Sequence, residues 1–207
     1  MNTAQMVWIT PDAEKLIGKI ARVSNPANED NPNVEGLLRY LIKHKHWSPF
    51  EMASMCVEIK TTRAISPQIL RHRSFSFQEF SQRYAVATMY DIPDLRRQDL
   101  KNRQNSIDDL PEERVEFLQT KIDDHFRQGL DLYNQLLDSN VAKECARGVL
   151  PMNTRTRLYM SGTIRSWLHY TDLRCANGTQ IEHKEIADQI RLILECEMPI
   201  IARAMWG

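Results

Sequence analysis

Residues 71–84 carry the densest group of side chains that could do chemistry. The segment reads RHRSFSFQEFSQRY and holds three arginines, three serines, a histidine and a glutamate. Arginine guanidinium groups and serine hydroxyls bind phosphate or carboxylate oxygens, so the composition predicts an anion pocket. Phe75, Phe77 and Phe80 are interleaved with these residues and would anchor the segment while the others face a ligand. An amphipathic edge strand with solvated charges explains the same pattern, and both interpretations stay open at this point.

Other chemistries lack the residue patterns that they need. The chain has only 7 glycines and neither a GxGxxG nor a Walker pattern, so side chains would have to hold any nucleotide. His44, His46 and His72 have no partner at a metal-binding spacing, and we expect no metal site. Ser81 has His72 and Glu79 nearby but lacks the GxSxG turn of a hydrolase nucleophile. We therefore interpret Ser81 as a phosphate ligand.

The charges of the chain are balanced overall but unevenly distributed. Its 207 residues include 27 basic and 27 acidic side chains and 42% hydrophobic residues, which is typical of one ordinary globular domain. Four arginines face one acid in residues 63–83, six basic residues face two acids in 143–174, and twelve acids face seven basic residues in 91–138. Two cationic segments in a neutral chain favour a small anionic ligand over a long polyanion.

The cysteines and the ends of the chain indicate a compartment. Cys56, Cys145, Cys175 and Cys196 form no CxxC pair, so we expect reduced core thiols and no disulfide framework. No apolar run approaches the roughly 20 residues that cross a bilayer. The N-terminus lacks the basic start and apolar stretch of a signal peptide. We expect a cytoplasmic protein with no membrane partner.

Hydrophobic periods and turn signals predict the elements that must position these residues. Helices are expected over about 11–23, 37–44, 66–70, 111–137, 141–148, 164–174 and 180–197. Strands are expected over 53–60 and 154–163. Residues 74–90 should lie extended at a site, and residues 92–110 should form a surface excursion. Helices with a few antiparallel strands predict an α+β fold, organised as a single domain over residues 1–207.

The order of residues in the dense segment matches a known signature. Arg71-His72-Arg73 is followed after seven positions by Ser81, and then by Arg83-Tyr84. This order resembles the RHR-x7-S signature of the flavin-dependent thymidylate synthases, the ThyX type. Further elements similar to that family are Ala21-Arg22-Val23-Ser24, His46-Trp47-Ser48-Pro49-Phe50-Glu51, Ala146-Arg147 with Leu150-Pro151, Arg165-Ser166 and Leu173-Arg174. Gln68, Gln180 and Glu182 also stand at the family's spacing, so the resemblance covers nearly the whole chain.

The resemblance implies the reductive methylation of dUMP to dTMP. In that family methylenetetrahydrofolate supplies the carbon, and FAD reduced by NADPH supplies the hydride. The resemblance also implies a ThyX-like fold with one long helix, and a homotetramer whose active sites combine residues from several subunits.

The resemblance assigns site residues position by position. The dUMP-binding residues would be Gln68, Arg71, Glu79, Ser81, Gln82, Arg83, Arg147 and Arg174. The FAD-binding residues would be Ser24, Ser48, Arg71, His72, Arg73, Gln78, Glu79, Thr163, Arg165 and His169. The sequence departs from the family at four positions, since the family often has Asn where Gln78, Thr163 and His169 stand, and His where Gly178 stands. A histidine packed in the core is the other interpretation of His169.

Arg174 is the residue that we expect to be catalytic. Methylation at C5 of uracil needs electron density at C5, which either a cysteine thiolate at C6 or stabilisation of the N3-deprotonated ring can supply. No cysteine lies in a recognisable nucleophile context, and the resemblance implies the second route. A guanidinium stays protonated, so Arg174 would stabilise the anion electrostatically rather than act as a base.

A binding module is the competing class of function. An arginine-rich and aromatic segment such as 71–84 could grip single-stranded nucleic acid by stacking and phosphate contacts. The pI of about 7.0 and the absence of an RNP or KH signature disfavour this alternative, and we expect no nucleic-acid partner.

Overall fold

A four-stranded antiparallel sheet forms the centre of the molecule. The structure is a computed structural model that describes residues 2–207. The strand order is β1-β2-β6-β3, and the strands are β1 (Thr3–Ile9), β2 (Ser54–Thr62), β3 (Ser76–Glu79) and β6 (Arg155–Thr163). β2 and β6 pair along their full length, with Ser54 opposite Thr163 and Thr62 opposite Arg155.

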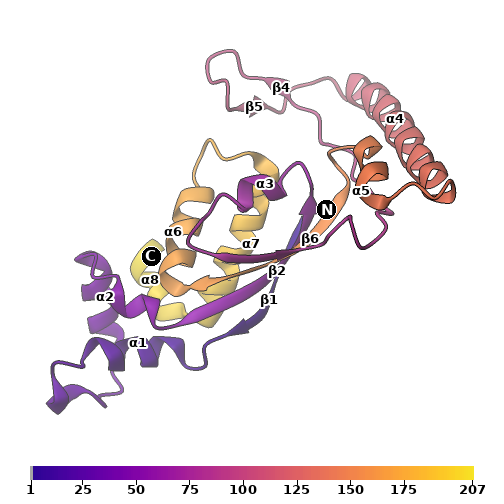
Figure 1. Ribbon diagram of the computed structural model, residues 1–207. Helices are drawn as coiled ribbons and strands as arrows, with labels where there is room; N and C mark the ends of the chain where they lie inside the picture. The colour runs from indigo at the N-terminus through magenta and orange to yellow at the C-terminus, as the bar shows by residue number, and fades with distance from the viewer. Residues whose placement is uncertain (1) are drawn as a thin grey trace.

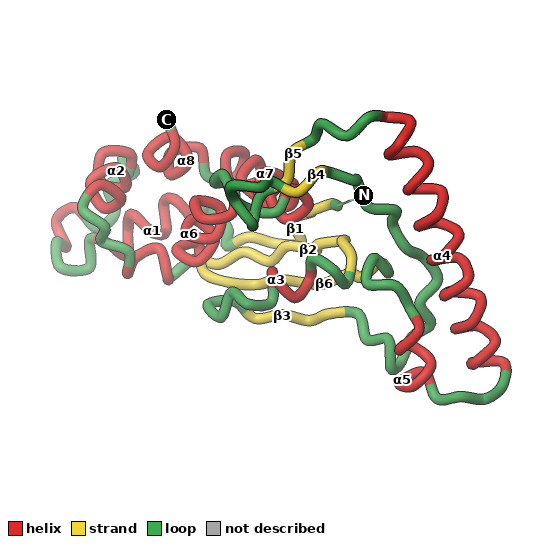
Figure 2. The backbone as a smooth tube through the Cα atoms, turned by 90° about the horizontal axis from the view of Figure 1, so that it is seen from above, coloured by secondary structure: helices red, strands yellow, loops and turns green. Residues whose placement is uncertain are grey.

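Five helices pack around the sheet (Figure 1, Figure 2). They are α1 (Ala13–Ala21), α2 (Glu35–Lys43), α6 (Ile164–Arg174), α7 (Ile181–Glu197) and α8 (Pro199–Trp206). α7 packs on β1, and α6 packs on both α7 and β6. Trp167 is fully buried in the main core, and its indole Nε1–H donates to the Met55 carbonyl at 3.0 Å, which ties α6 to β2. Short helical turns η1 (Pro26–Asn28) and η2 (Ser48–Glu51) connect α1, α2 and β2.

The long helix α4 (Glu112–Asp138) lies at the other end of the molecule, next to α5 (Lys143–Ala146) and η3 (Arg147–Val149) (Figure 2). Tyr133 is its one buried residue and joins Ala87 and Ala146 in a small second hydrophobic cluster. Before α4 the chain makes the excursion β4 (Arg97–Gln98) to β5 (Ser106–Ile107), which projects from the top of Figure 1. The α+β class, the antiparallel sheet and the long helix predicted from the sequence are therefore confirmed.

The sheet also anchors the arginine-rich segment. α3 (Ser66–Ile69) precedes this segment, and β3 carries its middle part along β6. Phe75 is buried and Phe77 packs against the main core, so the expected anchoring is confirmed for these two phenylalanines, whereas Phe80 is only half-buried and lies outside that core. Gly162 on β6 makes room for the ring of Phe75, because a Cβ at Gly162 would lie 2.5 Å from Phe75 Cδ1.

Some elements differ from the sequence predictions. α1 begins at Ala13 rather than near Pro11, because Asp12 adopts a left-handed conformation with φ of 49°. β1 was not predicted, since a register shift between Met6 and Trp8 breaks its alternation. α8 was also not predicted, although Pro199 suits the first turn of a helix as well as it suits a stop. Cys145 and Cys196 are exposed, so the expectation of core thiols is wrong for these two.

We expect Gly162→Ala to destabilise the protein by about 1–3 kcal/mol, because the new methyl group must displace the buried ring of Phe75. Urea unfolding would measure this change. Gly36→Ala is the control: its Cβ would meet nothing within 4 Å on α2, so it should leave stability unchanged or raise it by up to about 1 kcal/mol. Equal stability of Gly162→Ala and the unsubstituted protein would contradict this account of the anchor.

Candidate active site

The last turn of α6 brings Arg174 to the histidine of the Arg-His-Arg motif. Arg174 Nε donates to His72 Nε2 at 2.9 Å. Thr163 fixes the start of α6, since its Oγ1 accepts the Ser166 backbone N–H at 3.3 Å. Burial, reinforced by the charge of Arg174, lowers the pKa of His72 to about 4. His72 is therefore a neutral acceptor at pH 7, and the Arg174 guanidinium has no acidic partner within residues 2–207.

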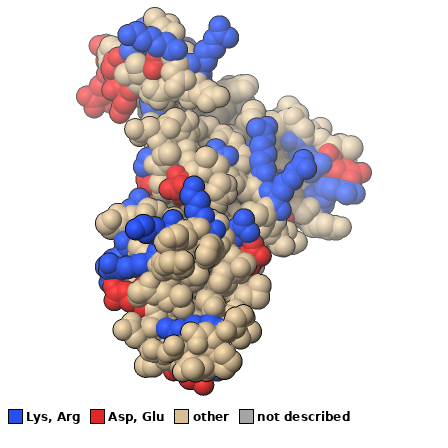
Figure 3. Space-filling model, turned by 90° about the vertical axis from the view of Figure 1, so that its left-hand side faces the viewer, with Lys and Arg blue, Asp and Glu red and all other residues tan. Residues whose placement is uncertain are grey.

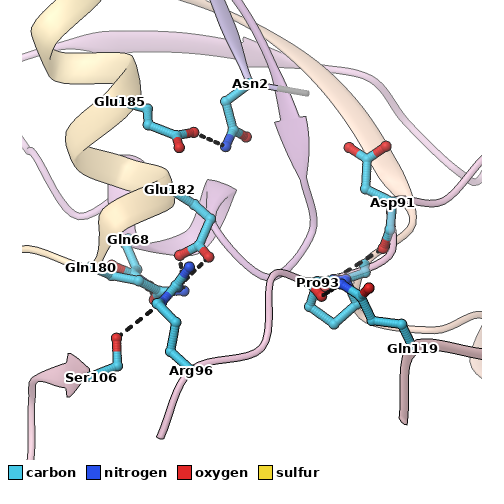
Figure 4. Close-up of polar contacts among 11 residues, drawn as sticks. Asn2, Gln68, Asp91, Pro93, Arg96, Ser106, Gln119, Gln180, Glu182 and Glu185 are labelled. Carbon is cyan, nitrogen blue, oxygen red and sulfur yellow. Dashed lines mark hydrogen bonds and ion pairs between the residues drawn. The ribbon is translucent and has the colours of Figure 1, made fainter. Parts of the chain in front are cut away.

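Gln68 belongs to a polar network that reaches the excursion (Figure 4). Gln68 Nε2 donates to Gln180 Oε1 at 2.6 Å, and Gln180 Nε2 donates to Glu182 Oε2 at 2.9 Å. Glu182 forms an ion pair with Arg96, whose Nε also donates to Ser106 Oγ at 3.0 Å. Burial acts to raise the pKa of Glu182, but hydrogen bonds from Arg96, the backbone and Gln180 together lower it. A cavity of about 420 Å³ lies beside this network and is lined by Gln180 and Glu182 among others.

A second cavity, of about 390 Å³, lies along the start of α6. Arg165 and His169 line it together with Trp47 and Ser74. Ser48 begins the η2 turn directly after Trp47, and Arg165 forms an ion pair with Glu51 of the same turn. Because His169 is exposed and lines the cavity, the interpretation of a core histidine is wrong.

A third group of predicted residues follows β3. Glu79 is half-buried, with Arg63 Nη1 at 3.0 Å from its Oε2 and a hydrogen bond of 2.8 Å from Thr156 Oγ1 to its Oε1. Ser81 Oγ accepts the Arg83 backbone N–H at 3.3 Å, and the Arg83 guanidinium pairs with Glu144 of α5 at 3.0 Å. Gln82 is buried, and Arg147 is exposed on η3 just beyond α5.

The predicted site residues do not form one connected set within a single chain. No side-chain hydrogen bond or ion pair among residues 2–207 joins Gln68 or Arg174 to Ser81, Arg83 or Arg147. Ser166 Oγ, which lines the second cavity, reaches the Ser74 carbonyl at 3.4 Å and so approaches the Arg-His-Arg motif. Gln78 is exposed on β3. Ser24 is exposed in the loop between α1 and α2, and it makes no side-chain hydrogen bond within the described part of the chain.

The arginines divide into paired and unpaired guanidinium groups. Five of those in the two cationic segments form ion pairs with acids: Arg63, Arg83, Arg155, Arg157 and Arg165.

 

Four other predicted arginines make no ion pair with any residue in 2–207: Arg71, Arg73, Arg147 and Arg174. On the face drawn in Figure 3, basic side chains predominate across the middle of the molecule, whereas its projecting top carries both signs. Fewer arginines of the cationic segments lack an acidic partner than the sequence indicates. The four that lack one within residues 2–207 are all predicted to bind ligand.

Sequence reasoning missed several residues that shape these groups. Arg96 is largely buried although it belongs to the surface excursion, and Tyr170 and His183 are fully buried beside His72. Each contacts residues far away in the sequence, so no local spacing could have identified it. Within residues 2–207, no cluster of three or more His, Cys, Asp or Glu side chains is arranged to hold a metal ion. Over the same residues, no helix is long and apolar enough to cross a membrane.

Known proteins resemble this chain over most of its length. The family described as "Thymidylate synthase complementing protein" matches residues 5–200. A probable flavin-dependent thymidylate synthase of Paramecium bursaria Chlorella virus 1 is 52% identical over 195 residues, which cover 93% of this chain and 90% of that protein. The flavin-dependent thymidylate synthase of Synechocystis sp. (strain ATCC 27184 / PCC 6803 / Kazusa) is 52% identical over 192 residues, covering 93% and 89%.

A solved structure shares the fold. The UMP/dUMP methylase PolB from Streptomyces cacaoi, bound with 5-Br dUMP, superimposes with a TM-score of 0.87 at 27% identity, covering 99% of this chain and 94% of that chain. The matching family model and the two 52% identical relatives extend over the same region as the signature residues, from the Arg-His-Arg motif to Arg174. The chain therefore belongs to the flavin-dependent thymidylate synthase family.

Proposed function

We propose that this enzyme methylates dUMP reductively to dTMP, with methylenetetrahydrofolate as carbon donor and FAD reduced by NADPH as hydride carrier. The observation that carries this proposal is the set of four unpaired arginines, Arg71, Arg73, Arg147 and Arg174. A nucleotide phosphate, a flavin pyrophosphate and the glutamate tail of a folate are all anions that such arginines can hold. The dUMP analogue bound to the related methylase supports the choice of nucleotide.

The second cavity fits part of a flavin. Its volume of about 390 Å³ lies within the range of small-molecule sites, and Trp47 and Leu168 give it apolar walls. Arg165, His169 and Ser74 supply polar groups at its edge, while Arg71 and Arg73 are free to hold the pyrophosphate. When bound there, FAD would supply the hydride. Ser24, Ser48, His72, Gln78, Glu79 and Thr163 remain proposed contacts from the family resemblance.

The proposed dUMP site combines subunits of a homotetramer. Its residues in one chain are Gln68, Arg71, Glu79, Ser81, Gln82, Arg83, Arg147 and Arg174. Within residues 2–207, no side-chain hydrogen bond or ion pair joins Arg174 to Arg83 or Arg147, which supports a site completed by another copy of the chain. Large exposed apolar side chains also support assembly: Trp8, Tyr84 and Met152 are 46%, 83% and 72% exposed. We propose that residues 1–207 act as a single domain within this tetramer.

Arg174 would activate the pyrimidine. Its guanidinium stays charged, and its Nε–H is occupied by neutral His72, so its terminal nitrogens remain available for the O4 and N3 edge of uracil. A fixed cation there stabilises the ring anion, which raises the electron density at C5 toward the folate-borne carbon. Ser81 would orient dUMP through its hydroxyl without forming a covalent bond.

The cysteines support a mechanism without an enzyme thiolate. Burial raises the pKa of Cys56, and burial together with a hydrogen bond from the Cys175 thiol to Asp188 raises the pKa of Cys175 to about 12. A thiol must ionise to attack C6, so neither residue is suited to that step. Cys145 is exposed on α5 next to Glu144, and it is the cysteine that needs a direct test.

The alternative of a nucleic-acid-binding module is not retained, because the chain belongs to an enzyme family and its free arginines lie in separate groups. The cytoplasmic location stays a prediction from the sequence.

We expect the purified protein to absorb as a flavoprotein and to methylate dUMP, and Arg174→Ala to slow single-turnover methylation by about 10²–10³-fold. The assay would use pre-reduced enzyme and saturating dUMP. Arg174→Lys keeps the charge but loses the planar fork, so its rate should lie between the two. A near-normal rate in Arg174→Ala would remove this residue from the mechanism.

We expect Cys145→Ser to keep the methylation rate within about threefold, since the proposed chemistry forms no bond to a thiolate. Cys196→Ser is the matched control, because Cys196 is equally exposed but lies on α7. A loss of more than about a hundredfold in Cys145→Ser alone, with dUMP binding intact, would indicate a cysteine nucleophile.

We expect subunit mixing to restore activity between two inactive variants. The two variants are Arg147→Ala and Arg174→Ala. No side-chain hydrogen bond or ion pair within residues 2–207 connects Arg147 with Arg174, and the proposed site takes them from different chains, so mixed tetramers should contain some sites with both arginines intact. Methylation would be measured after co-refolding and compared with each variant refolded alone. Absence of any recovery, with mixed tetramers demonstrated by tagged subunits, would place both arginines of a site on one chain.

A further inference from the structure

A buried polar pair lies directly behind the histidine of the Arg-His-Arg motif. Tyr170 on α6 and His183 on α7 are fully buried, and Tyr170 Oη lies 3.0 Å from His183 Nε2. The other ring nitrogen of His183, Nδ1, has no hydrogen-bond partner within residues 2–207. Burial acts to lower the pKa of His183 to about 4 and to raise the pKa of Tyr170, so both groups are neutral at pH 7.

Tyr170 also packs against His72. Their ring centroids lie 4.9 Å apart with an interplanar angle of 76°, so the edge of one ring faces the other. His183 lies close to the same histidine, at 6.2 Å between centroids. The imidazole of His72 therefore packs against the ring of Tyr170, and the Tyr170–His183 hydrogen bond holds that ring in place.

Tyr170 and Arg174 are four residues apart on α6, so they project from the same face of the helix. His72 contacts both: its ring meets Tyr170, and its Nε2 accepts the Arg174 Nε–H at 2.9 Å. Because the guanidinium is rigid and planar, the hydrogen bond that its Nε–H donates fixes the plane of the whole group. The direction in which Arg174 presents its terminal nitrogens is thus set by how His72 lies.

Burying a hydroxyl and an imidazole costs stability that a phenylalanine and an aliphatic residue would avoid. His183 Nδ1, which has no hydrogen-bond partner within residues 2–207, adds to that cost. Packing alone therefore gives no reason for this pair, whereas a fixed orientation of the Tyr170 ring does.

We propose that the Tyr170–His183 hydrogen bond is a positioning device that orients the Arg174 guanidinium through His72. This inference rests on the proposed function, in which Arg174 stabilises the uracil anion. Neither Tyr170 nor His183 contacts dUMP in this scheme, so both are positioning residues.

Tyr170→Phe removes the hydroxyl and keeps the ring, which makes it the sharpest test. We expect single-turnover methylation at saturating dUMP to slow by about tenfold, with dUMP affinity changed by less than about twofold. In the Arg174→Ala background the same substitution should have no further effect, because the residue being positioned is gone. Tyr133→Phe is the control: Tyr133 is also a fully buried tyrosine, but it lies on α4, and its rate should be unchanged.

A second measurement does not depend on turnover. In a ¹⁵N-labelled protein, exchange of the Arg174 Nε–H with water should become about tenfold faster in Tyr170→Phe. His183→Leu should copy the effects of Tyr170→Phe, whereas His183→Gln, which keeps a polar group toward Tyr170, should stay closer to the unsubstituted protein. If Tyr170→Phe does not fold, the comparison of His183→Leu with His183→Gln tests the same proposal.

Two results would overturn the inference. One is an equal slowing by Tyr170→Phe with and without Arg174, which would indicate a general structural role. The other is an unchanged rate and unchanged exchange in both Tyr170→Phe and His183→Leu. Failure of the proposed function is distinct from these, since it would show as a near-normal rate in Arg174→Ala itself.

Discussion

The pairing of β2 with β6 is the constraint on which the rest of the structure depends. Its register places Ser54 opposite Thr163, so α6 must begin where β2 begins. The Ile164 N–H donates to the Ala53 carbonyl at 2.8 Å and holds the first turn of α6 to that end of the sheet. About three helical turns later the same helix delivers Arg174. β3 pairs with the other side of β6 and brings the arginine-rich segment next to it. The positions of α6 and of the arginine-rich segment, the two parts of the candidate site, therefore both depend on β6.

Ion pairs with acidic residues engage some arginines of the cationic segments and leave others without an acidic partner within residues 2–207. Glu79 is half-buried between Arg63 and Thr156, and this ion pair closes the end of β3 against the sheet. Arg71 and Arg73 lie only a few residues earlier, yet they are exposed and have no acidic partner in the described chain. Two arginines of one cationic segment can thus have opposite roles, and a count of charges along the sequence cannot separate them.

The sequence was most informative where the pattern is local. The alternation in 53–60 and the long apolar period of α4 each lie within one segment, and each corresponds to an element of the structure. The RHR-x7-S order also lies within one segment, but its Arg-His-Arg motif contacts Arg174 whereas Ser81 lies beside Arg83. Contacts between distant segments left no such pattern. Arg96 meets Glu182 across 86 positions, and Arg174 meets His72 across 102, so only the folded chain could show these pairs. β1 was missed for a related reason, since its bulge removes the period of two.

The contact of Arg96 with Glu182 bears on how this chain can change over evolution. It holds the base of the excursion to the start of α7, and through Gln180 it reaches Gln68. The hairpin beyond that contact is exposed, with Leu100 89% accessible to solvent. An insertion or deletion in the outer part of the hairpin should therefore leave this network intact, whereas a substitution of Arg96 would remove the ion pair that ties the excursion to α7.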